Sequence, residues 1–208
     1  MADFTAKDVQ ALRLATGAGI MDAKRALEET GGDPERAKDL LREKGLAAAA
    51  KRTDRAQAEG AIGVYMHHQA GRPTIGVLVE LASETDFVAK SEAFQEMAND
   101  LAMHVAASSP QWVKVEDVPP AVLEKEKALI AAAARNEGKP DHIIDKIVEG
   151  RLRTFLEDNV LMEQTFVRSE KFDGTVGEMV GQMAATMGEN ISVNRFSRLA
   201  VGEGLDAS

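Results

Sequence analysis

Apolar positions in the first 45 residues recur at helical spacing and are interrupted by glycine. Thr5 followed by Asp8 forms a capping-box pattern that predicts the start of a first helix, which Gly17 ends. A second helical run stops at Gly31-Gly32, and Asp33-Pro34 begins a third, because Asp caps free amides and Pro fits the first turn. The expected apolar stripes are Val9, Leu12 and Ala15, then Ile20, Ala23, Ala26 and Leu27, then Ala37, Leu40 and Leu41. We therefore predict a three-helix domain over residues 1–45.

The next segment is rich in alanine and lacks glycine and proline. Residues 46–57 have high helix propensity and predict a semi-rigid helical linker. The linker carries a basic cluster of Lys51, Arg52 and Arg55. This cluster could touch an acidic partner, but a solvated linker face is the interpretation that the residues favour.

The period changes to two after Gly60. Ile62, Val64 and Met66 alternate, as do Ile75, Val77, Val79 and Leu81 after a turn at residues 69–73, which predicts an antiparallel hairpin. Helical spacing returns over residues 91–105, after Pro119-Pro120, after Pro140 and over residues 176–187, and a last strand is expected from Ile191 to Phe196. The predicted fold class is α+β, with a small antiparallel three-stranded sheet packed with helices in a core domain over residues 58–201 and a flexible tail at 202–208.

Composition narrows the classes of function. Hydrophobic residues make up 44% of the 208 residues and charged residues 28%, as in globular domains. The formal net charge of −9 opposes direct nucleic-acid binding, and the absence of Cys excludes disulfides and thiolate metal sites. The polar start does not resemble a signal peptide, and no apolar run approaches the roughly 20 residues of a membrane span. These features favour a cytoplasmic protein without membrane association.

Candidate catalytic motifs are weak. Gly17-Ala18-Gly19 has no preceding strand and no third glycine, so we reject a dinucleotide site. His67 and His68 are adjacent on a predicted strand and point to opposite faces, and His104 has no second ligand at helical spacing. A small hydrolase or metal enzyme using these histidines is the alternative that they leave open. We expect no enzyme activity and no cofactor.

The segment Thr85-Asp86-Phe87-Val88 combines an acid and a large aromatic residue between the hairpin and the following helix. Such junctions on a rigid scaffold often carry function. From the residues alone, we favour a local role in which Phe87 packs beneath its own following helix and Asp86 caps backbone amides.

Two stretches resemble the signatures of the elongation factor Ts family. The first is Arg13-Leu14-Ala15-Thr16-Gly17-Ala18-Gly19-Ile20-Met21-Asp22-Ala23-Lys24-Arg25-Ala26-Leu27, and the second is Glu84-Thr85-Asp86-Phe87-Val88-Ala89-Lys90. Further similarity lies at His104-Val105-Ala106, Asn136 to Pro140, Glu149 to Leu152 and Gly188-Glu189-Asn190-Ile191, so the resemblance spans nearly the whole chain.

The resemblance implies a ubiquitin-associated-like N-terminal domain that contacts the nucleotide-binding domain of elongation factor Tu. Its expected partner-binding residues are Arg13, Thr16, Gly17, Gly19, Met21, Asp22 and His104, with Met21 as the apolar anchor and the two glycines shaping the turn.

In this family, Thr85, Asp86, Phe87 and Val88 would displace the magnesium ion that accompanies GDP on elongation factor Tu. The expected function is therefore guanine nucleotide exchange. The chain would bind elongation factor Tu in its GDP-bound and nucleotide-free forms and promote the release of GDP.

Longer family members carry two related core subdomains, and this chain has room for one. The resemblance to short members implies a homodimer with twofold symmetry, in which the C-terminal strand and helix region completes the sheet or core. A different class of function is a non-catalytic adaptor whose three-helix domain binds a protein partner. That hypothesis leaves Asp86 and Phe87 unexplained.

Overall fold

The chain divides into two compact units that are each discontinuous in sequence. The computed structural model describes residues 4–204. Unit 1 contains the described residues up to Gly60 together with Ala82–Ser91 and Val180–Ser192. Unit 2 contains Ala61–Leu81, Glu92–Met179 and the described residues from Val193 onward. The domain boundaries expected from the sequence, at 1–45, 46–57, 58–201 and 202–208, stay a prediction, and residues 205–208 of the expected tail lie outside the described part.

Three helices form the expected N-terminal bundle in unit 1: α1 (Ala6–Thr16), α2 (Ile20–Glu29) and α3 (Pro34–Ala50). Thr5 and Asp8 close a reciprocal capping box at α1, and the Asp33 carboxylate accepts hydrogen bonds from the first amides of α3. The bundle core consists of Val9, Leu12, Ala23, Ala26, Leu27 and Ala37, with Phe4, Leu40 and Leu41 packed against it. Ala15 and Ile20, which were expected in the apolar stripes, are exposed instead.

Helical structure in the predicted linker extends only to Ala50, where α3 ends. The amides of Arg52 and Arg55 then donate to carbonyls three residues earlier, and the Thr53 hydroxyl donates to the Ala50 carbonyl. Residues 51–54 therefore form turns and not the continued helix expected from alanine content. Thr53 and Asp54 fit this difference, because short polar side chains compete with helical backbone bonds.

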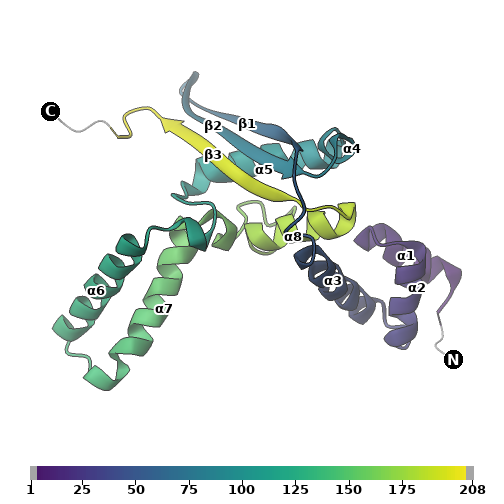
Figure 1. Cartoon of the computed structure of the whole chain (residues 1–208), viewed down its shortest axis with the longest axis horizontal. Helices are drawn as coiled ribbons and strands as arrows, with labels where there is room; N and C mark the ends of the chain where they lie inside the picture. Colours follow the sequence, from purple (N-terminus) through teal and green to yellow (C-terminus); the bar gives the residue numbers. More distant parts are fainter. Residues whose placement is uncertain (1–3, 205–208) are drawn as a thin grey trace. The chain divides into compact units, whose positions relative to one another are not determined.

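The sheet contains β1 (Glu59–Gln69), β2 (Arg72–Ser83) and β3 (Ser192–Ala200), which are antiparallel and ordered β1-β2-β3. Ala70 and Gly71 both have positive φ and form the tight hairpin turn. Helix α5 (Glu92–Ser108) lies along one face of the sheet (Figure 1). A Cβ atom on Gly63 would lie 1.8 Å from the Ala98 carbonyl oxygen, so glycine lets β1 approach α5 closely. Val77, Val79, Leu81, Phe94 and Leu101 are buried in this layer.

The opposite face of the sheet is apolar and open in the single chain. Because side chains alternate along a strand, Ile62, Val64 and Met66 point away from the face that Gly63 presents to α5. A Cβ atom on Gly76 would lie 3.1 Å from the Met66 sulfur, which places β2 residues of the same phase, Leu78 among them, on this face. We call Ile62, Val64, Met66 and Leu78 the outer sheet face; each side chain is about half exposed.

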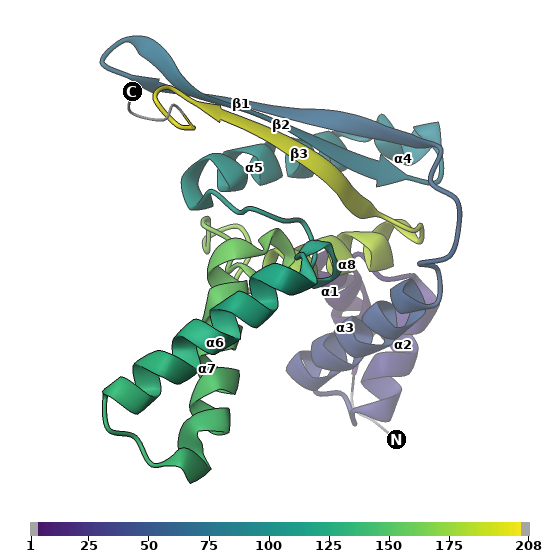
Figure 2. The same ribbon diagram turned by 60° about the vertical axis from the view of Figure 1, so that its left-hand side comes forward.

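The remaining helices complete the α+β fold that the sequence predicts. Helices α6 (Pro120–Asn136) and α7 (Asp141–Asn159) form an antiparallel pair (Figure 2). Short helix α4 (Asp86–Ala89) follows β2, and α8 (Val176–Met187) precedes β3. Two 3-10 turns, Val115–Asp117 and Leu161–Glu163, lie between the longer elements. Over residues 4–204, none of the helices has the length and apolar content needed to cross a membrane.

Candidate functional site

The turn between α1 and α2 carries the first group of expected partner-binding residues. Gly17 ends α1 with φ of 69°, and its amide donates to the Arg13 carbonyl oxygen. The Thr16 hydroxyl donates to the Leu12 carbonyl and accepts from the Ala18 amide. Gly19 is the N-cap of α2, where Asp22 lies in the first turn. Thr16 and the two glycines therefore shape this turn, while the side chains of Arg13 and Asp22 are exposed beside it.

Three large apolar side chains are exposed around the same turn. Met21, the expected anchor, is 63% exposed, and Ile20 and Leu14 are 58% and 77% exposed. We call these three residues the bundle patch. Leu14 was not among the expected contact residues, because it lies off the helical spacing of the buried Val9 and Leu12. Ile20 was expected in the core, because it fits the helical spacing of Ala23 and Leu27. The bundle patch has the character of a protein-binding surface, since large apolar side chains gain most from burial by a partner.

The second group lies at the junction after β2, which we call the Phe87 turn (Thr85 to Lys90). Thr85 is the N-cap of α4, and its hydroxyl accepts a hydrogen bond from the Val88 amide. Phe87 is 83% exposed, so the interpretation that it packs beneath its own helix is wrong. Val88 is half-buried and Ala89 is buried. The turn therefore buries its far end and presents the Phe87 ring to solvent.

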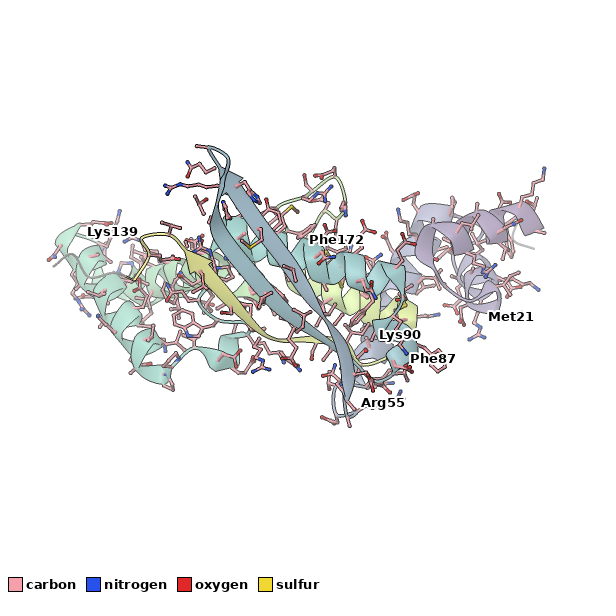
Figure 3. All side chains as sticks on the ribbon, turned by 90° about the horizontal axis from the view of Figure 1, so that it is seen from above. Met21, Arg55, Phe87, Lys90, Lys139 and Phe172 are labelled. Carbon is pink, nitrogen blue, oxygen red and sulfur yellow. The ribbon has the colours of Figure 1, made fainter. Side chains whose placement is uncertain are left out.

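Asp86 is paired within the Phe87 turn. The Lys90 ammonium lies 2.6 Å from the Asp86 carboxylate, one helical turn away. Figure 3 labels Lys90 and Phe87 at this turn. The hydrogen bond and positive charge of Lys90 lower the pKa of Asp86, and the same pair raises the pKa of Lys90. Thr85 supplies the N-cap hydrogen bond of α4. The turn thus presents an aromatic ring beside a carboxylate that is held in its charged form.

His104 differs from the other expected partner-binding residues because it is fully buried in unit 2. Its Nδ1 atom accepts from the Val167 amide at 3.2 Å, and Nε2 lies 3.0 Å from the Gln164 Oε1 atom. The ring also stacks on Phe166 at a centroid distance of 5.7 Å. In this structure His104 ties α5 to the 164–167 segment and does not reach the surface.

The described residues hold no metal-binding cluster: residues 4–204 contain no group of three or more His, Asp or Glu side chains arranged to hold an ion. The Phe87 turn and the bundle patch present apolar and charged surface. Their geometry is suited to binding a macromolecule.

Comparison with known proteins finds a matching family model and relatives that share its name. A family model described as "Elongation factor TS" matches residues 35–203. A protein of Geotalea daltonii named "Elongation factor Ts" is 54% identical over 203 residues, covering 98% of this chain and 92% of its own length. Proteins of the same name from Geobacter sulfurreducens and Thermosipho melanesiensis are 52% and 51% identical, and the match covers 92% and 100% of their lengths. These matches therefore cover most or all of the length of each relative.

Proposed function

This chain belongs to the elongation factor Ts family of translation elongation factors, and from that premise we propose that it binds elongation factor Tu and promotes the release of GDP from it. The proposed partner is elongation factor Tu in its GDP-bound and nucleotide-free forms. The site of action is cytoplasmic, where translation takes place, with no direct binding to nucleic acid or membranes.

The observation that carries this proposal is the exposure of Phe87 on a turn whose other end is buried. Phe87 is 83% exposed to water, so covering its ring with a partner surface favours binding. Aromatic side chains are also frequent among the residues that contribute most to the binding free energy of protein interfaces. We propose that Phe87 inserts beside the nucleotide site of the partner, while Asp86 and its neighbours Thr85 and Val88 disturb the groups that hold magnesium. Because Asp86 is ion-paired, it approaches the partner together with Lys90.

The second proposed contact is the bundle patch with its polar rim. Met21, Ile20 and Leu14 would pack on the nucleotide-binding domain of the partner, and Arg13 and Asp22 would supply charged contacts at the edge. Thr16, Gly17 and Gly19 contribute by holding the shape of the turn. His104 contributes indirectly, through the packing of α5.

Exchange of this kind needs no covalent chemistry, so the protein is not an enzyme in that sense. A protein that binds nucleotide-free elongation factor Tu more tightly than the GDP-bound form must lower the affinity of elongation factor Tu for GDP by the same ratio. The proposed mechanism therefore uses contact free energy alone, and the chain needs no cofactor.

The outer sheet face supports a homodimer. Four large apolar side chains from β1 and β2 are about half exposed in the single chain, and a second copy could cover them with an identical face. In the proposed dimer the contact lies on the sheet hairpin, in addition to the C-terminal strand and helix region that the resemblance implies.

Stopped-flow release of a fluorescent GDP analogue from elongation factor Tu tests the proposal. We expect strong acceleration by the parent protein and at least about a tenfold smaller effect of Phe87→Ala, which removes an interfacial aromatic anchor. Leu129→Ala is the matched control, because Leu129 is a large exposed apolar residue on α6 and outside both proposed contacts. A folded parent protein that leaves the release rate unchanged would contradict the proposal.

The adaptor hypothesis makes a different prediction. An adaptor would bind its partner through the bundle patch alone, so Met21→Ala would weaken binding while Phe87→Ala would not. Measuring the affinity of both variants for elongation factor Tu separates the two functions.

A further inference from the structure

The Phe87 turn is held by a carboxylate that lies 104 residues further along the chain. Glu189 follows the end of α8 and accepts three hydrogen bonds from the start of the turn. Its Oε2 atom accepts from the Glu84 and Thr85 amides at 3.0 and 3.1 Å, and its Oε1 atom accepts from the Thr85 hydroxyl at 2.5 Å. Both partners lie in unit 1.

The contact is reciprocal. The Glu84 carboxylate accepts from the Asn190 amide at 2.6 Å, so each segment caps the backbone of the other. The Asn190 side chain is buried and donates to the carbonyls of Thr53 and Arg55 at 3.1 and 2.9 Å. Three segments distant in sequence therefore meet at the base of the turn.

Glu189 also fixes the direction of the Thr85 hydroxyl. Because that hydroxyl donates its proton to Glu189, its lone pairs are left to accept from the Val88 amide, which is the capping bond of α4. Hydrogen bonds to a charged acceptor are stronger than neutral ones. The Glu189 carboxylate thus stabilises the short helix that carries Phe87, although Glu189 itself belongs to the segment after α8.

We propose that Glu189 is a positioning residue for nucleotide exchange, which orders the Phe87 turn so that the Phe87 ring is presented to the partner GTPase. This inference rests on the proposed exchange function. Gly188 makes the geometry available, because its φ of 73° ends α8 and turns the chain toward the Phe87 turn.

The test compares Glu189→Ala in the parent protein and in the Phe87→Ala variant. In the parent protein we expect the maximal rate of GDP release, at saturating factor, to fall about tenfold, and Glu189→Gln to fall less because it keeps one acceptor oxygen. In the Phe87→Ala background the same change should alter the rate by less than about twofold, since the two residues act as one unit. An equal fold-loss in both backgrounds, or no loss in the parent, overturns the inference.

A second measurement does not depend on the partner. Amide hydrogen exchange of Thr85 and Val88 should speed up in Glu189→Ala and stay unchanged in Glu29→Ala, a control that removes the carboxylate of the Lys44 ion pair in the same unit. Unchanged protection in Glu189→Ala overturns the inference. If the parent protein fails to accelerate GDP release, the proposed function falls, and the amide measurement still decides whether Glu189 orders the turn.

Discussion

His104 shows how one buried residue can hold two segments of unit 2 together. The Val167 amide donates to Nδ1, so the neutral ring carries its proton on Nε2 and donates it to Gln164. The Gln164 amide group in turn donates to the Asp158 carbonyl at 2.7 Å, which fixes the orientation of the side chain. A doubly protonated ring would lose the Val167 bond and carry a buried charge.

The first prediction concerns the pH dependence of stability. Burial lowers the pKa of His104 below its ordinary value of 6.5, so the unfolded chain takes up a proton at a higher pH than the folded chain. Neutral His104 makes its full contribution to the free energy of unfolding when the pH is above the ordinary pKa. This contribution is lost as the pH falls through that value toward the lowered pKa of the folded chain. Urea unfolding at pH 7.5 and pH 5 should show this loss, and His104→Gln should reduce it. His142→Gln, at an exposed position, should leave the pH dependence unchanged; a loss equal in all three proteins would contradict the assignment.

The second prediction concerns the charge on the Phe87 turn. Because the hydrogen bond and charge of Lys90 lower the pKa of Asp86, Lys90→Met should return that pKa toward its ordinary value of 3.8. A titration of the Asp86 carboxyl carbon by nuclear magnetic resonance measures the change. Lys24→Met, which removes the longer ion pair to Glu28, is the control and should not move the pKa of Asp86. A value for Asp86 that is the same in the parent and the Lys90 variant would contradict this account.

Among the helices, close approach between elements explains three glycines, two in the bundle and one in α8. Within unit 1, a Cβ atom on Gly45 of α3 would lie 3.0 Å from the Ala185 Cβ atom of α8, and one on Gly181 would lie 2.9 Å from a Leu46 methyl carbon. A Cβ atom on Gly17 would lie 2.8 Å from the Thr186 methyl carbon. The α1 to α2 turn and α3 are therefore packed on the C-terminal half of α8, whose end also carries Glu189.

The third prediction separates backbone strain from packing at Gly17. Gly17 and Gly31 have nearly equal positive φ, 69° and 70°, but only Gly17 has a neighbour within 4 Å. Gly31→Ala should lower the free energy of unfolding by about 1 kcal/mol through backbone strain alone, and Gly17→Ala should lower it by about 2 kcal/mol or more. Thermal and urea denaturation measure both. Thr186→Ser removes the methyl group that an added Cβ atom would meet, so in this background Gly17→Ala should cost no more than Gly31→Ala. If Gly17→Ala still costs more there, the extra loss does not come from contact with α8.

Local patterns predicted the elements well and the contacts between them poorly. The capping box at Thr5, the Asp33-Pro34 start and the hairpin period are all signals between near neighbours, and the structure confirms them. The exposure of Phe87 could not be predicted from the residues, because the same local sequence is compatible with a ring buried beneath α4 and with a ring exposed on the turn. The contact of Glu189 with Thr85 joins positions 104 residues apart, which periodicity cannot detect.

The same limit applies to which face of an element is buried. Alternation correctly placed Ile62, Val64 and Met66 on one side of β1, but it cannot distinguish the side that packs on α5 from the side that is open. Gly63 approaches Ala98 of α5 closely, so the alternate residues Ile62, Val64 and Met66 lie on the open side of the sheet. For the expected partner-binding residues, the resemblance supplied the positions and the structure showed which of them are exposed. The exposure of Leu14 and Ile20 emerged only from the structure.

For the whole molecule, the outer sheet face and the net charge act in opposite directions on the proposed homodimer. Covering large apolar side chains favours association, whereas two chains of formal charge −9 repel each other over distances that salt screens. Without Cys, no disulfide holds the two copies together. The dimer should therefore dissociate on dilution and become tighter as salt concentration rises.

The fourth prediction places this contact on the outer sheet face. Val64→Lys puts a charge in the middle of the face and should weaken self-association by at least about tenfold, because the charge would be desolvated in the dimer. Sedimentation velocity over a range of protein and salt concentrations measures the effect. Leu129→Lys, at a similarly exposed apolar position on α6, should leave association unchanged.

A parent protein that stays monomeric at high salt and high concentration would remove the homodimer from the proposed mechanism, and each exchange event would then involve one copy of the factor. If association survives Val64→Lys, the two copies meet through another surface, and the C-terminal strand β3 becomes the next region to test.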